Sequence, residues 1–293
     1  MTGASGFVGR VLLARQVPGA TALALKVDDW RERIAATTWR GATVYHLAAR
    51  AHRGDDSDEA FERDNVDKTV ALAQAAASGG AQRLIFLSTI KVNGEETGER
   101  AFRPGDPPVP CDAYARSKAQ AELRLAEIAK GTGLATTVVR SPLVVGAGAK
   151  GNLEALMRLA DGPWPLPFAD LGNRRTLIDV EDLAALLVAC ATAPQAAGRT
   201  YFAGDPQPVS TAGLVAAIRR ALDRPPRMFR MPSAALELAA ALAGQRRRIR
   251  RLTRSLEVDV SETLRELPWR PCVPMEEGIA RMARAYRAAE AIR

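Results

Sequence analysis

Thr2-Gly3-Ala4-Ser5-Gly6-Phe7-Val8-Gly9 opens the sequence and runs directly into an apolar helical pattern. Glycines three residues apart before a helix suit a strand-to-helix turn whose backbone N–H groups approach a pyrophosphate. The alternative is a flexible, glycine-rich segment without a ligand. Folds that bind dinucleotides place such a loop first, so we interpret residues 2–9 as the phosphate-binding turn of an α/β fold.

Tyr114 and Lys118 lie four residues apart in the stretch Asp112-Ala-Tyr-Ala-Arg-Ser-Lys118. This spacing puts both side chains on one face of a helix, so the ammonium can sit beside the phenol. A positive charge there favours phenolate and lowers the pKa of Tyr114 from its reference of about 10. Such a phenol can exchange a proton with a substrate hydroxyl near neutral pH. The spacing also occurs by chance on amphipathic helices. It indicates an active site here because the glycine turn is present in the same chain.

Ser88 and Thr89 close a short apolar run that starts after Arg83. The run predicts a buried strand, which delivers both hydroxyls to the edge of a sheet. In an open α/β sheet, ligands bind at the carboxyl ends of the strands. We expect one of the two hydroxyls to cap the following turn and the other to face a substrate.

Strand-like and helix-like patterns alternate, which predicts an α/β fold with a doubly wound, Rossmann-like parallel sheet. Strands are expected over residues 21–26, 43–47, 83–87, 136–140 and 176–180, and helices over 7–15, 60–77, 112–130 and 152–160. We expect residues 1–148 plus 176–193 to form the dinucleotide-binding domain, with 176–193 returning to the main sheet. Residues 149–175 plus 194–293 should form a smaller C-terminal substrate lobe.

The composition of the 293 residues, 25% charged and 47% hydrophobic, is that of a soluble globular protein. No apolar stretch approaches the ~18 residues of a membrane span, and no secretory signal precedes the glycine turn. The three cysteines, Cys111, Cys190 and Cys272, show neither metal-ligand spacing nor a disulfide framework. We therefore expect a cytoplasmic protein that binds no metal.

The net charge of +8 is carried mainly by arginine, and residues 246–254 contain the one dense cluster. A solvated helix end is our first interpretation of this cluster, a diphosphate clamp the second and a nucleic-acid surface the third. Interleaved aromatic residues are absent from it, so we expect no nucleic-acid partner.

Together these motifs resemble the extended short-chain dehydrogenase/reductase family, in its NAD-dependent epimerase/dehydratase branch. The resemblance is carried by TGASGFVG (2–9), HLAA (46–49), Asn65, LST (87–89), YARSK (114–118), RSPLVVG (140–146) and RRTLIDVEDLA (174–184). It implies that Thr89 hydrogen-bonds the reacting sugar oxygen, with Ser88 a weaker candidate. It also implies that Tyr114 is the acid/base, and that Lys118 holds the nicotinamide ribose and lowers the tyrosine pKa.

An NAD or NADP cofactor follows from the same resemblance. The implied cofactor-binding positions are Gly3, Ser5, Gly6, Phe7, Val8, Asp28, Leu47, Ala48, Ala49, Tyr114, Lys118 and Pro142. Asp28 lies about twenty residues after the glycine turn, where a carboxylate bonds a ribose 2′-hydroxyl and selects NAD. Lys26 and Arg31 flank it and could accept a 2′-phosphate, and Asp28 could equally be a helix N-cap. The expectation favours NAD slightly over NADP.

The second half of the chain implies a UDP-sugar substrate. Asn152 resembles the family asparagine that contacts the diphosphate at a helix start, although it could be only an N-cap. Trp164-Pro-Leu-Pro167-Phe resembles the extended segment that binds the nucleotide base, usually uracil, through its backbone. Arg175 aligns with the arginine that pairs with the diphosphate, for which a planar fork is well suited. Arg251 is the candidate phosphate-binding arginine before the strand-like residues 255–260.

The residues after Thr89 exclude one reaction of the family. Sugar-nucleotide 4,6-dehydratases carry an Asp-Glu pair there, and this chain has Ile90 and Lys91. Residues 88–95 resemble instead a subgroup handling C4 chemistry on UDP-N-acetylated sugars, including 4-keto reductases of bacterial polysaccharide pathways. The expected function is hydride transfer at C4 of a UDP-hexose, by a 4-epimerase or a 4-keto reductase. The alternatives are a reductase of a non-sugar carbonyl and a catalytically idle dinucleotide-binding member. The resemblance further suggests a homodimer through the Tyr114 helix.

Two departures from the family pattern stand out. Members begin with an apolar strand before the Thr-Gly, whereas here Met1 directly precedes Thr2, so the first strand is missing from the sequence as given. We expect that the start codon has been assigned too late. The stretch from residue 21 to 45 is also shorter than two strands and two helices need. One strand-helix unit near residues 26–40 is therefore expected to be trimmed or lost.

Overall fold

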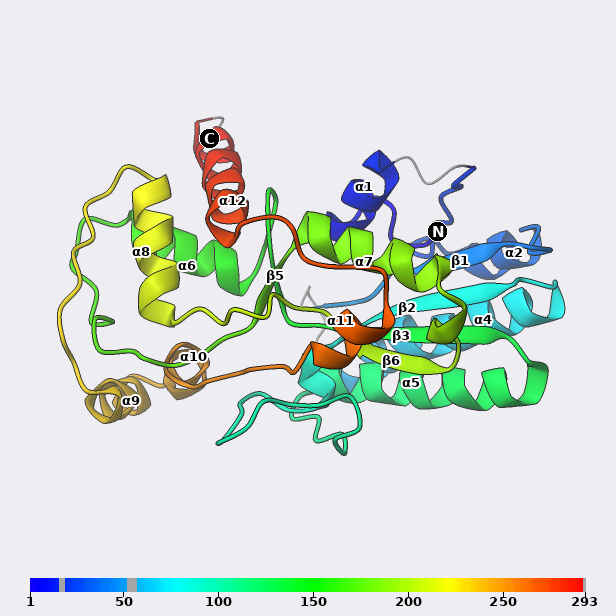
Figure 1. Cartoon of the computed structure of the whole chain (residues 1–293), viewed down its shortest axis with the longest axis horizontal. Helices are drawn as coiled ribbons and strands as arrows, with labels where there is room; N and C mark the ends of the chain where they lie inside the picture. The colour runs from blue at the N-terminus through cyan, green and yellow to red at the C-terminus, as the bar shows by residue number, and fades with distance from the viewer. Residues whose placement is uncertain (16–18, 52–56, 292–293) are drawn as a thin grey trace.

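A four-stranded parallel sheet organises the larger part of the molecule (Figure 1). This computed structural model describes residues 1–15, 19–51 and 57–291. The strands are β1 (Thr43–His46), β2 (Arg83–Thr89), β3 (Ala135–Ser141) and β6 (Arg199–Phe202), in the order β1-β2-β3-β6. Thr43 lies opposite Arg83, Arg83 opposite Ala135, and Thr137 opposite Arg199. The carboxyl ends of all four strands therefore meet at one edge of the sheet.

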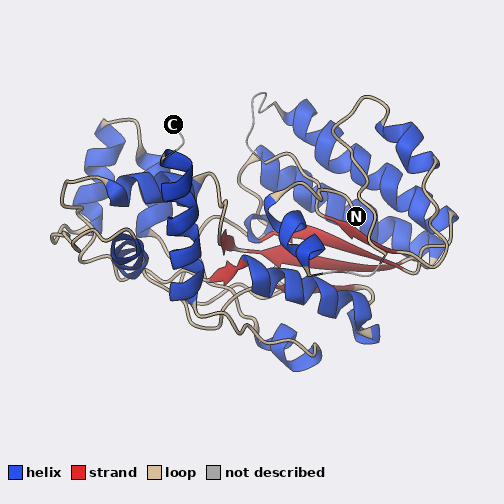
Figure 2. Ribbon diagram, turned by 90° about the horizontal axis from the view of Figure 1, so that it is seen from above, coloured by secondary structure: helices blue, strands red, loops and turns tan. Residues whose placement is uncertain are grey.

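Helices cover both faces of this sheet, as Figure 2 shows. One face carries α1 (Phe7–Ala14) and α7 (Val180–Thr192), and the other carries α2 (Trp30–Ala35), α4 (Lys68–Ser78) and α5 (Ala113–Thr132). Since side chains alternate along a strand, Ile85 packs under α7 while its neighbours Leu84 and Phe86 pack under α4 and α5. This double covering is the expected doubly wound arrangement.

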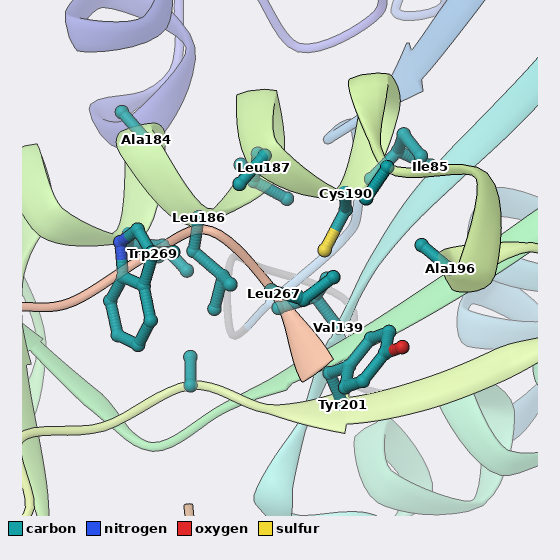
Figure 3. Packing of buried hydrophobic residues seen from close by; sticks show 14 of the residues in the cluster. Ile85, Val139, Ala184, Leu186, Leu187, Cys190, Ala196, Tyr201, Leu267 and Trp269 are labelled. Carbon is teal, nitrogen blue, oxygen red and sulfur yellow. The ribbon is translucent and has the colours of Figure 1, made fainter. Parts of the chain in front are cut away.

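The core under α7 joins this helix to strands of the main sheet (Figure 3). Leu186, Leu187 and Cys190 from α7 lie over Val139 of β3 and Tyr201 of β6, and all of these residues are buried. Burial raises the pKa of the Cys190 thiol to about 12, so this cysteine packs as a small apolar side chain. The core holds β6 and β3 in register beneath the helix.

Short helical segments lie beside these larger elements. The helix α3 (Asp58–Phe61) continues through a π-helix, η1 (Glu62–Asp67), into α4. The 3₁₀ segments are η2 (Ile90–Val92), which follows β2 directly, and η3 (Pro194–Ala196). π-Helical turns are frequent at functional sites, and this one faces the N-terminal half of α5.

A second group of helices forms a lobe beyond the carboxyl edge of the sheet (Figure 1). It contains α6 (Asn152–Asp161), α8 (Thr211–Ala221), α9 (Ser233–Leu242), α10 (Arg246–Thr253) and α12 (Met275–Glu290). Met157, Val215 and Ile279 are buried in its separate core. The helix α11 (Ser261–Glu266) lies instead beside β6. The lobe thus stands next to the edge where ligands of α/β sheets bind.

A small two-stranded sheet connects the two parts. It pairs β4 (Leu143–Val145) with β5 (Leu177–Asp179) in parallel. The prediction that a strand at 176–180 joins the main sheet is wrong, because the edge of β3 is occupied by β6. Pro142 separates β3 from β4, and its missing N–H ends the β3 ladder. The strands at 143–145 and 199–202 were not predicted.

The strand expected over residues 21–26 is also absent from the described structure. Only Leu23 forms a bridge, to Thr2, and Thr2 forms a second parallel bridge to His46. Gly3, at φ +70°, turns the chain away toward α1, so the ladder stops after one residue. Other predicted elements hold within a few residues, although the helix over 60–77 includes the π-helical turn.

Among the described residues, no helix combines the length and the apolar character that crossing a membrane requires.

Candidate active site

The glycine turn forms a tight backbone cradle between Thr2 and α1. Gly3 lies so close to the chain after β1 that a Cβ there would be 2.7 Å from the backbone N of Ala48. A Cβ on Gly9 would be 2.1 Å from the carbonyl oxygen of Gly3, which accepts a 2.9 Å hydrogen bond from Gly6 N–H. Gly6 is the N-cap of α1, and no side chain caps this helix. The first-turn N–H groups and the helix dipole therefore fit a pyrophosphate.

His46 supports this turn from below as a buried, neutral side chain. Thr69 donates its hydroxyl proton to the Asn65 carbonyl, so its oxygen accepts the Nε2 proton of His46 at 2.7 Å. Nδ1 then accepts from the Thr2 hydroxyl at 2.6 Å, and that hydroxyl accepts from Ala48 N–H at 3.2 Å. Burial, Lys118 and the terminal ammonium lower the pKa of His46 to about 3. The chain of bonds fixes Thr2 against Ala48.

The remaining candidate cofactor-binding residues differ in how exposed they are. Leu47, Ala48 and Ala49 leave the carboxyl end of β1 half-buried, and Ser5 is exposed in the turn. Phe7 and Val8 begin α1, and the Phe7 ring lies 3.4 Å from the position of a Cβ on Gly146. Pro142 is buried between β3 and β4.

Asp28, proposed to read the ribose, lies exposed in the turn before α2. It is not the N-cap of that helix, because Asp29 holds that position and pairs with Arg33 at 2.9 Å. The N-cap alternative for Asp28 is therefore wrong. Arg31 stacks on the Trp30 ring at 4.2 Å from its centroid, and the choice between NAD and NADP stays a prediction.

Tyr114 lies in the first turn of α5, directly against the end of β2. Asp112 is the N-cap of this helix, and its Oδ1 accepts a 2.8 Å hydrogen bond from Ala115 N–H. The Tyr114 phenol is hydrogen-bonded to the Thr89 hydroxyl. Thr89 also caps η2 by accepting from Lys91 N–H at 3.3 Å. The hydroxyl and the phenol that the sequence nominated are thus neighbours.

Lys118 occupies the interior beside them. The side chain is 1% exposed, donates a 2.8 Å hydrogen bond to the Leu87 carbonyl, and lies 3.7 Å from the centroid of the Phe86 ring. Burial lowers the pKa of Lys118 to about 7, although Glu122 opposes this change. The ammonium therefore faces strand β2 rather than the phenol.

The acidity of Tyr114 differs from the prediction. Burial and the Asp112 carboxylate raise the pKa of Tyr114 to about 12, although the hydrogen bond from Thr89 lowers it. The expected lowering of this pKa is therefore wrong for these side-chain positions: burial of the phenol raises it, and Lys118, whose own pKa falls to about 7, does not offset that burial. The phenol is consequently protonated at neutral pH in the cofactor-free chain.

Ser88, the weaker substrate-binding candidate, is engaged elsewhere. Its hydroxyl donates to Glu122, and Glu122 forms a 2.5 Å ion pair with Arg140. Arg140 also donates a 2.9 Å hydrogen bond to Asn93 Oδ1. Thr89, and not Ser88, is therefore the hydroxyl that caps the next turn, and it is also the one that is hydrogen-bonded to Tyr114. Which hydroxyl faces a substrate stays a prediction.

The arginines proposed for the diphosphate meet near the C-terminus of α10. Arg175 donates to the carbonyls of Arg251 and Arg254 at 2.8 and 3.0 Å, and burial lowers its pKa to about 10. Arg251 lies 3.2 Å from Glu95 and 4.0 Å from Asp112. Arg251 therefore reaches toward the tyrosine helix, while Arg175 anchors the lobe.

Asn152 and Pro167 lie in the lobe, away from these arginines in sequence. Asn152 is exposed as the first residue of α6, and the N-cap is Gly151 at φ +68°. The N-cap alternative for Asn152 is therefore wrong. Pro167 stands between the buried residues Leu166 and Phe168, in a segment that bridges to Met228.

Asn65 is a polar residue of the site to which sequence reasoning gave no role. Asn65, on the π-helix, donates to the Ser117 hydroxyl at 2.9 Å and accepts from Arg50 N–H at 2.7 Å. It ties the Tyr114 helix to the chain after β1. Asn65 was part of the family resemblance, and that was its only sequence signal.

Within residues 1–15, 19–51 and 57–291, no group of His, Cys, Asp and Glu is arranged to hold a metal.

A parallel sheet, a glycine cradle at the start of α1 and a Thr-Tyr-Lys group at the carboxyl edge define the Rossmann-like short-chain dehydrogenase/reductase class. Residues 1–204 match the model of the NAD dependent epimerase/dehydratase family. The chain belongs to this family. It is 37% identical to the UDP-glucose 4-epimerase of Vibrio cholerae over 249 residues, which cover 83% of this chain and 76% of that protein.

Similarity to other proteins is lower in sequence identity. The chain is 26% identical to 3beta-hydroxysteroid-dehydrogenase/decarboxylase isoform 1 of Arabidopsis thaliana, over 81% of this chain and 60% of that protein. The structure of UDP-glucose 4-epimerase from Thermotoga maritima superposes with a TM-score of 0.75 at 19% identity, covering 99% of this chain and 98% of that one. At this identity the superposition demonstrates the shared fold alone.

Proposed function

We propose that this protein is an NAD(P)-dependent nucleotide-sugar epimerase that acts at C4 of a UDP-hexose. The observation that carries the proposal is the hydrogen-bonded pair Thr89 and Tyr114 at the carboxyl edge of the sheet, above the buried Lys118. The 37% identity to a UDP-glucose 4-epimerase supports the substrate class.

The glycine cradle and α1 would hold the pyrophosphate of the dinucleotide. The fit rests on the backbone approach at Gly3 and on the uncapped first turn of α1. When bound, a nicotinamide would accept hydride from C4 of the sugar and return it. We propose that the lobe of α6, α8 and α10 holds the nucleotide part of the substrate, with Asn152, Pro167, Arg175 and Arg251 as its candidate contacts.

Tyr114 would act on the C4 hydroxyl as general base and later as general acid. Thr89 would donate a hydrogen bond to the same sugar oxygen and keep it beside the phenol. A phenol with a pKa of about 12 in the cofactor-free chain is a weak base at neutral pH. Its acidity must therefore increase on ligand binding, when a positively charged ring and the substrate replace water in the site.

Two assays test this proposal. UDP-glucose and UDP-N-acetylglucosamine are incubated separately with the protein and catalytic NAD, and the sugar is examined by proton NMR. Inversion at C4 without net change of NAD is the expected result. No conversion of either sugar, with NAD demonstrably bound, would overturn the epimerase proposal.

A 4-keto reductase is the second candidate function, favoured by the Ile90-Lys91 sequence after Thr89. It uses the same residues, with NADPH or NADH consumed in proportion to a 4-keto sugar supplied. A reductase of a non-sugar carbonyl ranks third, supported by the 26% identity to a steroid dehydrogenase/decarboxylase. Protection of the chain from thermal unfolding by UDP separates the sugar-nucleotide proposals from this one.

We also propose a homodimer through α5. Leu123 on this helix is 62% exposed, an unusual position for a leucine flanked by charged residues. Light scattering of the protein and of Leu123→Glu tests this association. A dimer for the parent and a monomer for the variant is the expected result, and a parent monomer would contradict it.

A further inference from the structure

Lys91 is a charged residue at the site to which the proposed mechanism gives no role. It lies in η2, two residues after Thr89, and its side chain is 20% exposed. Its ammonium is 2.7 Å from Asp112 Oδ2 and 6.0 Å from the centroid of the Tyr114 ring. A cation in this position acts on both the acid and the phenol.

Asp112 connects Lys91 to α5, the helix that carries Tyr114. One carboxylate oxygen caps α5 at Ala115, and the other accepts the hydrogen bond from Lys91. The carboxylate is thus fixed two residues before Tyr114, and its negative charge opposes ionisation of the phenol. Lys91 is the ammonium that neutralises this charge.

Other charged groups surround the pair. Glu95 lies 4.0 Å from Lys91, Arg251 of α10 lies 4.0 Å from Asp112, and Lys118 follows Tyr114 by one turn of α5. The helix α3 packs against Tyr114 through the Phe61 ring, at 6.3 Å between centroids, while its acids Asp58 and Glu59 are exposed. Charges of both signs therefore act on the Tyr114 phenol. Lys91 and Asp112 form an ion pair beside it, since Asp112 lies two residues before Tyr114 and the Lys91 ammonium lies 6.0 Å from the ring centroid.

We propose that Lys91 is a positioning residue of the active site, which holds and neutralises Asp112 and thereby sets the acidity of the Tyr114 phenol. The inference rests on the proposed function and extends it, since it assigns a role to the lysine at the second position of the acidic pair of dehydratases. It predicts opposite effects for the two partners. Removing the cation hinders ionisation of Tyr114, whereas removing the carboxylate favours it.

A titration of the cofactor-free protein tests the proposal without turnover. Tyr114 is replaced by a difluorotyrosine, whose more acidic phenol titrates in an accessible pH range, and its ionisation is followed by fluorine NMR. Lys91→Met should raise the midpoint by about one pH unit, a tenfold change in the ionisation constant. Asp112→Asn should lower it by a similar amount. The double variant should return close to the parent midpoint.

The variants are chosen to separate electrostatics from folding. Asn is as good an N-cap as Asp, so Asp112→Asn keeps the start of α5. Lys91→Arg should retain the parent midpoint, and Lys130→Met, at the far end of α5, should leave it unchanged. Midpoints of Lys91→Met and Asp112→Asn that move in the same direction, or that do not move, would overturn the proposal.

Turnover gives a second readout that rests on the proposed function. With the UDP-sugar that the protein converts, Lys91→Met should lower kcat about tenfold at neutral pH and shift the pH profile upward, with KM nearly unchanged. If no UDP-sugar is converted by the parent protein, the proposed function fails, whereas the fluorine titration still decides the role of Lys91.

Discussion

Lys118 places its ammonium 3.7 Å from the centroid of the Phe86 ring. Phe86 lies on β2, the strand that ends at Thr89. The Leu87 carbonyl accepts a hydrogen bond from this ammonium at 2.8 Å. An ammonium has three donors, so this buried side chain is poorly solvated. The cofactor-free chain therefore holds a lysine whose charged form is disfavoured, next to the proposed acid/base.

The pH dependence of stability follows from this lysine. Burial lowers the pKa of Lys118 from 10.5 to about 7. Between these values the unfolded chain binds a proton that the folded chain does not, so stability rises with pH through that window. Lys118→Met should therefore stabilise the cofactor-free protein at about pH 6 by up to about 5 kcal/mol, since the pKa falls from 10.5 to about 7 and each pKa unit corresponds to about 1.4 kcal/mol.

Urea unfolding at several pH values checks this prediction. The advantage of Lys118→Met should shrink as the pH rises from about 7 toward 10.5, because the unfolded lysine also becomes neutral. A variant that is less stable than the parent throughout this range would show that Leu87 and Phe86 compensate the burial fully.

The phenol of Tyr114 is expected to be required for turnover but not for cofactor binding. Tyr114→Phe keeps the ring against Phe61 and removes the hydroxyl that meets Thr89. Turnover should fall by about 10²–10⁴, the usual contribution of general acid–base catalysis. Steady-state kinetics and NAD binding by calorimetry are the two measurements. Tyr286→Phe, on α12, is the matched control, and a Tyr114→Phe variant with parent-like turnover would refute the role.

The glycine turn should not tolerate a methyl group at Gly9. A Cβ there would lie 2.1 Å from the Gly3 carbonyl oxygen and 2.9 Å from Ala4, which are backbone atoms that cannot turn aside. Gly9→Ala should lower the free energy of unfolding by about 1–3 kcal/mol and weaken NAD binding at least tenfold. Gly105→Ala, with no atom within 4 Å of the new Cβ, is the control. Unchanged NAD affinity in Gly9→Ala would contradict the assignment.

The buried ion pair of Glu122 and Arg140, next to Ser88, should contribute more to the free energy of unfolding than an exposed ion pair on the same helix. Glu122→Ala leaves the guanidinium of Arg140, 8% exposed, without its carboxylate. Loss of one partner of a buried pair costs about 3–5 kcal/mol. Glu127→Ala, on the same helix, removes the exposed partner of Arg124 and should cost less than about 1 kcal/mol. Equal midpoints for both variants in denaturant unfolding would disprove this difference.

Local patterns predicted the elements that carry the site. The apolar run before Ser88 became β2, and the stretch after Asp112 became α5, because a strand and a capped helix are specified by neighbouring residues. The juxtaposition of Thr89 and Tyr114 followed from the strand end and from the family resemblance. These predictions needed no knowledge of long-range partners.

Predictions that depended on distant partners were less successful. Residues 177–179 and 199–202 both form short strands, and only the neighbouring strand decides which one completes the main sheet. Similarly, the spacing of Tyr114 and Lys118 fixes their helix face but not the direction of the ammonium, which the Leu87 carbonyl determines. Ser88 meets Glu122 from 34 residues away, and no local pattern signals this contact.

The strand order β1-β2-β3-β6 has a consequence for how the chain is made. β3 gains its second neighbour only when β6 has been synthesised, after β4, α6, β5 and α7. Until then the growing chain carries an open, apolar strand edge, which is prone to pair with other chains. Pairing of Thr137 with Arg199 across that interval is a distant contact, which folds slowly. Expression that supplies chaperones should therefore raise the yield of soluble protein.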